Sequence, residues 1–436
     1  MTPATVVKAA GAAQFLSFIP RILGYHPSES LVVIPFQGAR SLGAMRFDLP
    51  AGGETDGVAA TVIGLACRLP EADAVAAIAY TGARFQDRDR MPHRELLDAL
   101  DRRAHACGLR ITDLLCVAAD GWGSALDPGC PPSGRPLTDL DGAGTQLQGL
   151  PAADGDQASG AELPESLPEE QERVARALTA LDDAVEVLCG PDAVAGGRLR
   201  GAPAVSAAPL PEATHAPEAA PAPDHRSPAA WHACDLGPVP GPISGDADEG
   251  DPAPESDARI DPRALRTACR FDDLPDLFED ALEQRPTARD AYDSAALVWC
   301  LARPSLRDVA LVQWSGNLAD GDEALDAQLR WESGEEYPAH LAMRMWGEGD
   351  TPDVARLVSA LEVCRHAAAV APREARPGAL AMCAWLSWAL GRSTHAAAYA
   401  GMACEIEPEH GLSQIVLSFV QAGHLPDWAF RRGAPR

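Results

Sequence analysis

A proline-rich, acidic stretch near the middle of the chain sets the strongest limit on how this sequence can fold. Twelve prolines lie between Gly201 and Ser256, and the stretch from Gly201 to Asp257 holds ten carboxylates and one arginine. No apolar periodicity crosses it, so it cannot bury enough apolar surface to offset the entropy lost on ordering. We therefore expect a disordered linker over residues 191–258, with a folded module on each side.

The block before the linker alternates between strand and helix patterns. Continuous apolar runs rich in β-branched residues indicate buried strands, and apolar residues at helical spacing indicate the helices between them. In chain order these segments are the strands Ser30–Phe36 and Ala44–Leu49, the helix Val58–Arg68, the strand Ala74–Tyr80, the helix Pro92–Cys107 and the strand Asp113–Ala119. This order predicts an α/β module over residues 1–136, with a mixed sheet covered by helices.

Two segments follow before the linker. Residues 137–168 have low complexity and are expected to form a loop. Residues 169–190 carry apolar side chains at helical spacing, and we expect this helix to pack on the α/β module.

Beyond the linker the pattern is helical. Helix-capping residues and prolines at helix starts predict an all-α module of about eight to ten helices over residues 259–430. Seven of the nine tryptophans lie there among many alanines, which is typical of close helix packing. One stretch resembles a single tetratricopeptide unit, through the spacing of Leu380, Ala384, Gly391, Ala396, Ala400, Ala403 and Pro408.

Composition narrows the class of partner. The formal net charge is -27 at pH 7, and nine of these charges belong to the predicted linker. A negative field repels phosphate groups, so neither nucleic acid nor a membrane surface is expected as a partner. No apolar run approaches the roughly 18 residues that span a bilayer, and the start of the chain has no convincing leader-peptide cleavage site. The predicted location is the cytoplasm.

The eleven cysteines suggest no covalent framework. They are scattered, form no Cys-x-x-Cys pair and mostly sit inside apolar runs. We expect buried free thiols, no disulfides and no metal site. The chain also lacks the glycine-rich loops that bind the phosphates of nucleotides, so we expect no cofactor.

Arg46 and Asp48 are the first candidate ligand-binding residues. They lie two apart on a predicted strand and so point to the same face. Two alternatives stay open for them. They can form a structural ion pair, or Arg46 can offer its guanidinium group to an anionic ligand.

The loop Ala119–Leu137 leaves the end of the last predicted strand, where α/β sheets often bind ligands. Its candidate binding residues are Asp120, Trp122, Ser124 and Arg135. The alternative is a proline- and glycine-rich cover over the sheet edge. Cys130 is a possible nucleophile, but no histidine stands at a recognisable motif spacing, and His93 and His105 are expected to be buried structural residues. No catalytic motif is present, so the sequence leaves open whether the protein is an enzyme.

Several of these strings together resemble an actinobacterial family described as domain of unknown function 4192. They are LGYHPSESLVV, MRFDLP, DGWGS with CPPSGRPL, LARPSLRDVAL and the tail from GEGDTPD to GHLPDW. The family pattern falls on Gly24, Pro27, Ser30, Arg46, Asp48, Pro50, Asp120, Trp122, Cys130, Gly134, Pro136, Arg307 and Asp308. The resemblance implies no known activity, cofactor or substrate.

Two functional hypotheses follow. The first is a non-enzymatic protein-interaction or regulatory protein, which binds a protein partner through the helical module. The second is an enzyme or a small anionic-ligand binder, in which Arg46, Asp48, Asp120 and Arg135 converge on one ligand beside the N-terminal sheet. A weaker third possibility is that the acidic linker is itself a recognition segment.

Overall fold

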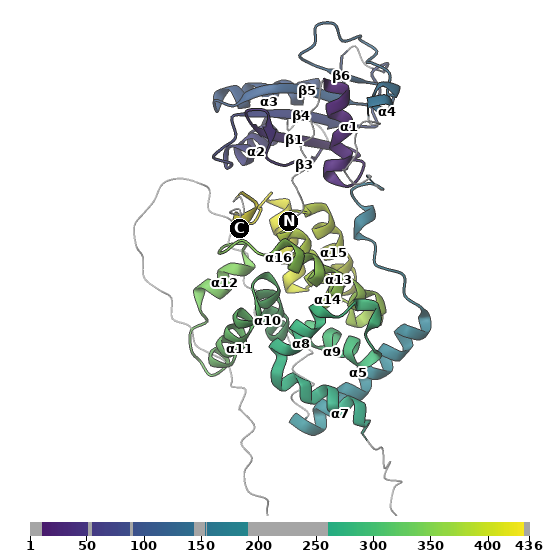
Figure 1. Ribbon diagram of the computed structural model, residues 1–436, viewed down its shortest axis with the longest axis vertical. Coiled ribbons are helices and arrows are strands. Elements are labelled where there is room, and N and C mark those ends of the chain that lie inside the picture. Colours follow the sequence, from purple (N-terminus) through teal and green to yellow (C-terminus); the bar gives the residue numbers. More distant parts are fainter. Residues whose placement is uncertain are drawn as a thin grey trace, which may run out of the picture. The chain divides into compact units, whose positions relative to one another are not determined.

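The computed structural model describes residues 11–50, 55–87, 90–143, 153, 155–190 and 260–430 (Figure 1). The predicted linker at 191–258 lies outside these residues. Contacts divide the chain into two compact units. The first contains the chain up to Glu162 and short C-terminal pieces, and the second runs from Leu163 to Val420 with Leu425–Trp428.

The first unit is the predicted α/β module. Its elements are α1 (Ala12–Leu23), β1 (Ser30–Gln37), β2 (Arg40–Ser41), β3 (Met45–Asp48), α2 (Thr55–Cys67), β4 (Ala74–Tyr80), α3 (Arg94–Ala106), β5 (Arg110–Val117), β6 (Trp122–Ser124) and α4 (Thr138–Ala143). All six predicted elements are confirmed, and the unit has four further elements, the short strands β2 and β6 and the helices α1 and α4.

The six strands form one mixed sheet in the order β2-β1-β4-β5-β6, with β3 also paired to β1. β4 and β5 are parallel and joined by α3, whereas the other pairs are antiparallel. The carboxyl ends of β4 and β5 therefore lie at the same end of the sheet as the start of β1, because Ser30 pairs with Tyr80.

Helices cover both faces of this sheet (Figure 1). Leu31 and Val33 of β1 point to the face that α2 and α3 cover. Val32 and Ile34 point to the opposite face, which α1 covers. This double burial explains why β1 and β4 are continuous apolar runs without polar alternation.

The segment predicted as a low-complexity loop at 137–168 contains some regular structure. Helix α4 begins at Thr138, and its Leu140 packs on the α1 face of the core. A short 3₁₀ helix spans Ser159–Ala161. The Gln157 side chain accepts a hydrogen bond from the Ser28 amide and donates one to the Ser28 carbonyl, both at 2.9 Å. Composition missed these pieces because each is only a few residues long.

The second unit is all-helical, as predicted. After α5 (Pro168–Cys189), residues 260–430 contain ten α-helices. They are α7 (Pro262–Ala268), α8 (Leu274–Glu283), α9 (Ala291–Leu301), α10 (Pro304–Ser315), α11 (Leu318–Glu332), α12 (Ala339–Met345), α13 (Val354–Val370), α14 (Pro377–Ala389), α15 (Ser393–Ile406) and α16 (Gly411–Gln421). Every residue of α14 is buried, so it is the central helix of this unit.

Helix α5 corrects one prediction. The sequence predicted that it packs on the α/β module, but it belongs to the helical unit and packs against α7, α9 and α13. Its Val174 and Ala177 share a core cluster with Ala295 and Val370. Asp182 accepts a hydrogen bond from the Trp299 indole at 2.9 Å. Helical periodicity shows which face of α5 is buried but not which partner buries it.

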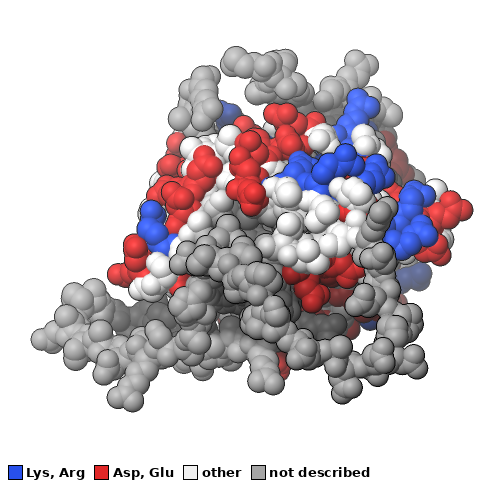
Figure 2. All heavy atoms as spheres, turned by 90° about the horizontal axis from the view of Figure 1, so that it is seen from below, with Lys and Arg blue, Asp and Glu red and all other residues white. Residues whose placement is uncertain are grey.

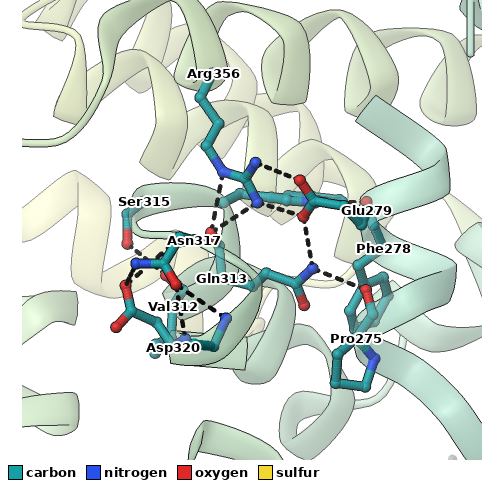
Figure 3. Close-up of polar contacts among 11 residues, drawn as sticks. Pro275, Phe278, Glu279, Val312, Gln313, Ser315, Asn317, Asp320 and Arg356 are labelled. Atoms are coloured by element: carbon teal, nitrogen blue, oxygen red, sulfur yellow. Dashed lines mark hydrogen bonds and ion pairs between the residues drawn. The ribbon is translucent and has the colours of Figure 1, made fainter. Parts of the chain in front are cut away.

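A polar network joins α8, α10 and α13 inside the helical unit (Figure 3). Arg356 donates to both carboxylate oxygens of Glu279, at 2.6 and 2.5 Å, and also to the Gln313 carbonyl. The fully buried Gln313 side chain donates to Glu279 and to the Pro275 carbonyl. These bonds fix how the three helices meet.

Candidate functional site

The four residues expected to converge on an anionic ligand lie on opposite edges of the sheet. Arg46 of β3 pairs with Val32, and this row continues through Ile78 and Leu115 to Ser124 of β6. Four steps of about 4.8 Å separate these edges by roughly 19 Å. Arg46 and Asp48 therefore do not share a site with Arg135, whose backbone pairs with Trp122 of β6. The sequence could not reveal this, because it gives the strands but not their order.

Arg46 and Asp48 form the structural pair that was one of the two alternatives. Their side chains lie 2.6 Å apart, with Asp48 exposed and Arg46 mostly buried. The Arg46 Nε also donates to Ser30 Oγ at 2.8 Å, and this buried hydroxyl donates to the Ser28 carbonyl. The contacts among these residues fasten β3 to the start of β1.

The loop after β5 contains β6 and folds back on it, because the Arg135 backbone pairs with Trp122. Ser124 is buried and donates to Asp113, and Arg135 forms an ion pair with Asp127 at 2.6 Å. Trp122 is also buried, with the Arg135 guanidinium group 5.7 Å from its ring centre. Ser124 therefore ties β6 to β5, and Arg135 ties the rest of the loop to itself and to β6.

The other family-pattern positions have local structural roles. Gly24 ends α1 in the left-handed region at φ 85°, and Pro27 is half-buried between α1 and β1. Cys130 lies over the backbone of Gly123, where an added Cβ would come 2.6 Å from its sulfur. In the helical unit, the buried Arg307 donates to its neighbour Asp308.

A different group of polar residues lies at the carboxyl-terminal ends of β4 and β5. We call Glu29, Thr81, Gly82 and His93 the Thr81 cluster. The Glu29 carboxylate lies 3.3 Å from Thr81 Oγ1 and accepts the Gly82 amide at 2.5 Å. His93 Nε2 lies 3.3 Å from the same hydroxyl. Glu29 precedes β1, Thr81 and Gly82 follow β4, and His93 precedes α3, so three segments supply the cluster.

The backbone of the cluster is unusual at two places. Glu29 and His93 have φ values of 42° and 56°, and they are the two non-glycine residues with positive φ among those described. Left-handed backbone is uncommon for residues with side chains and costs roughly 1 kcal/mol or more. Gly82 leaves room for this arrangement, because an added Cβ would lie 3.1 Å from Glu29 Oε1 and the carboxylate would have to shift by a few tenths of an ångström.

Asp120 holds the neighbouring loop in place. Its carboxylate accepts the Phe85 and Gln86 amides at 2.8 and 3.2 Å. Desolvation acts to raise the pKa of Asp120, but these backbone hydrogen bonds and Arg84 outweigh it and lower the pKa below its usual value. Asp120 is therefore ionised at neutral pH and joins the loop after β4 to the loop after β5.

The cluster is rich in hydrogen-bond acceptors. It offers a carboxylate, a hydroxyl group and an imidazole, which together suit a ligand with hydroxyl or amine donors. Within the described residues, the two arginines predicted for ligand binding are each paired with a carboxylate elsewhere in the module. The described part of the chain also contains no group of three or more His, Cys, Asp or Glu placed to hold a metal ion.

Sequence reasoning missed this cluster. Ligands of α/β sheets bind beyond the carboxyl ends of strands, and this rule points to Thr81 and Gly82 after β4 as well as to the loop after β5. His93 was expected to be buried within a helix, yet it precedes α3 and is half-buried, and His105 is exposed. The positive φ of Glu29 leaves no sequence signal.

Figure 2 shows one face of the molecule, on which acidic and arginine side chains surround an uncharged area. Among the helices described, none is both long and apolar enough to cross a membrane.

The fold therefore defines an α/β module with helices on both faces of its sheet, followed by an all-helical unit. The chain belongs to the family described as domain of unknown function 4192, whose model matches residues 13–240. That match contains the whole Thr81 cluster but not Arg307 or Asp308. No curated protein and no solved structure matches the chain.

Proposed function

We propose that the α/β module binds a small molecule with hydroxyl or amine groups at the Thr81 cluster. One observation carries this proposal: Glu29 and His93 both adopt left-handed backbone, and both side chains contact Thr81. Strained residues that meet at one point are characteristic of binding sites, because the fold must compensate for the strain elsewhere. Glycine would make either turn without this cost.

The position of the cluster supports the same proposal. It lies beyond the carboxyl ends of parallel strands, where ligands of α/β sheets commonly bind. The residues that the family model matches include every member of the cluster. The Thr81 hydroxyl group also accepts a hydrogen bond from the Ala83 amide at 3.2 Å, which gives it a structural role in the loop. We therefore propose binding at this hydroxyl group and not a reaction of it.

The chemistry argues against the anionic ligand that the sequence suggested. Glu29 adds negative charge, and Asp120 lies in the adjoining loop and is ionised. With Arg84 as the cation beside Asp120, the two carboxylates leave a net negative charge that disfavours anions, whereas hydroxyl and amine groups can donate to the Glu29 carboxylate.

Thr81→Val tests the proposal because it removes the hydroxyl group and keeps the shape of the side chain. Thr112→Val is the matched control, since Thr112 donates to the Val75 carbonyl at the opposite end of the same strand pair. In a thermal-shift screen of the full chain, polyols, amino alcohols and polyamines should include stabilisers of the wild type and of the control but not of Thr81→Val. Equal stabilisation of all three proteins would reject the site.

A second function is favoured by the surface of the helical unit. We propose that this unit binds a protein partner. Among the eleven large apolar residues exposed in the described chain, six lie between residues 318 and 354. Leu318 and Leu329 share one stripe of α11 with the half-buried Leu325, at helical offsets of seven and eleven residues. Concentrated exposed apolar surface is typical of interaction sites.

The residues whose spacing resembles a tetratricopeptide unit lie in α14, in the turn after it, in α15 and just beyond α15. The helices α14 and α15 pack on each other, and Gly391 turns the chain between them at φ 75°.

Leu329→Glu tests the proposal that the helical unit binds a protein partner, with Val187→Glu on the exposed face of α5 as control. Only the first change should abolish co-purification of a partner with the tagged full chain. Loss in both variants, or in neither, would count against this surface.

Origin and location complete the proposal. Arginine supplies all but one of the basic residues, which fits a GC-rich actinobacterial genome. We propose that the protein acts in the cytoplasm.

A further inference from the structure

Two exposed thiols meet at the ends of α2 and α3. Cys67 is the last residue of α2, and Cys107 directly follows α3. Both are free and exposed, which corrects the expectation of buried thiols at these positions. The Cys107 thiol lies within hydrogen-bond reach of the Cys67 thiol.

The packing of α2 against α3 positions these two cysteines. α2 and α3 pack side by side on the same face of the sheet, and the buried Ala66 and Ala104 belong to its core cluster. The Cys107 amide donates to the Arg103 and Ala104 carbonyls, and Gly108 then turns the chain at φ 77°. Both cysteines are therefore anchored by helix backbone and not by flexible loops.

We propose that Cys67 and Cys107 form a reversible disulfide when the protein meets a small-molecule disulfide. The Cys67 thiolate attacks one sulfur of the oxidant R–S–S–R, which forms a mixed disulfide and releases one thiolate. The Cys107 thiolate then attacks the Cys67 sulfur and releases the second. Two protein thiols lose two electrons and two protons, and the oxidant leaves as two R–SH molecules.

The environment sets the rate of this exchange. Desolvation and the neighbouring Cys107 thiol raise the pKa of Cys67 above its usual value. The thiolate fraction at neutral pH is therefore small, and oxidation should accelerate as pH rises. A bridge would close a loop of about 40 residues, so the oxidised module should melt roughly 5–10 °C higher.

The test treats the reduced full chain with oxidised glutathione, blocks the remaining thiols and maps the cysteines by peptide mass spectrometry. We expect a cross-linked peptide pair containing Cys67 and Cys107. Cys67→Ser and Cys107→Ser should each leave a glutathione adduct on the remaining cysteine of the pair, and neither variant needs the bridge to fold. Cys269→Ser, at an exposed cysteine of the helical unit, should keep the cross-link.

Two outcomes would overturn the proposal. One is separate glutathione adducts on Cys67 and Cys107 of the wild type without a cross-link. The other is no modification of either cysteine under conditions that modify Cys269.

Discussion

Arg356 offers a quantitative test of how the helical unit is held together (Figure 3). The Arg356 and Glu279 side chains are only 19% and 26% exposed, and Arg356 also donates twice to the Gln313 carbonyl. In Arg356→Met the methionine keeps much of the apolar stem, so the losses are the bidentate ion pair and the two hydrogen bonds to the Gln313 carbonyl. Removing one partner of a buried pair costs about 3–5 kcal/mol, and partial exposure reduces this to roughly 2–3 kcal/mol.

Tryptophan fluorescence during urea unfolding is the appropriate assay, because seven of the nine tryptophans lie in the helical unit. With a slope of about 2–3 kcal/mol per molar urea, the midpoint should fall by roughly 1 M. The control is Arg330→Met, since Arg330 and Glu335 are 4.0 Å apart and about half exposed. Such a surface pair contributes about 0–1 kcal/mol.

The same variant has a predicted pH dependence. The Arg356 hydrogen bonds lower the pKa of Glu279 below its usual value, against desolvation. A lowered folded pKa stabilises the protein above the unfolded pKa near 4.3, and this stabilisation is lost as pH falls through the folded value. The difference between wild type and Arg356→Met should therefore shrink on acidification below about pH 4. A midpoint shift no larger than that of the control, or a difference that grows in acid, would refute the reasoning.

Two further stability predictions concern the helical unit. Burial, with a contribution from Arg307, lowers the pKa of His410 to about 4, against about 6.5 when unfolded, so stability should fall by about 3 kcal/mol from pH 7 to pH 4. His410→Asn keeps an acceptor for the Ser413 amide and should reduce the change of unfolding free energy with pH, measured by urea titration. If that pH dependence is the same as in the wild type, other groups cause it. Gly347→Ala should lower the melting temperature by much more than Gly349→Ala does. Both glycines have positive φ, but only an added Cβ at 347 comes within 2.6 Å of atoms of Trp388 and Pro426. Equal losses would show that backbone strain alone matters.

Much of the fold could be predicted from the sequence. Ser30–Phe36 and Ala74–Tyr80 are apolar runs long enough to indicate strands, and α14 is apolar throughout, so local patterns sufficed for these elements. The packing partner of α5 and the order of the strands depend on contacts between distant segments, and periodicity does not contain that information.

The candidate site was harder to predict for the same reason. Arg46 and Arg135 are charged residues near strands, which makes them candidates in the sequence, yet each is paired with an aspartate on its own side of the sheet. Glu29 and Thr81 meet because β1 runs antiparallel to β4, and the segment before α3 brings His93 to the same hydroxyl group. The left-handed backbone of Glu29 and His93 is set by the surrounding fold.

Ligand binding at the Thr81 cluster is the central claim, and the thermal-shift comparison of the full-length wild type, Thr81→Val and Thr112→Val tests it most directly. At about 100 times its dissociation constant a specific ligand stabilises the native state by about 2.7 kcal/mol, which is a shift of several degrees. We predict such a shift with a polyol, amino alcohol or polyamine in the wild type and in Thr112→Val, and its loss in Thr81→Val. Stabilisation by carboxylates or phosphates instead, an equal shift in all three proteins, or no shift in the wild type would contradict the claim.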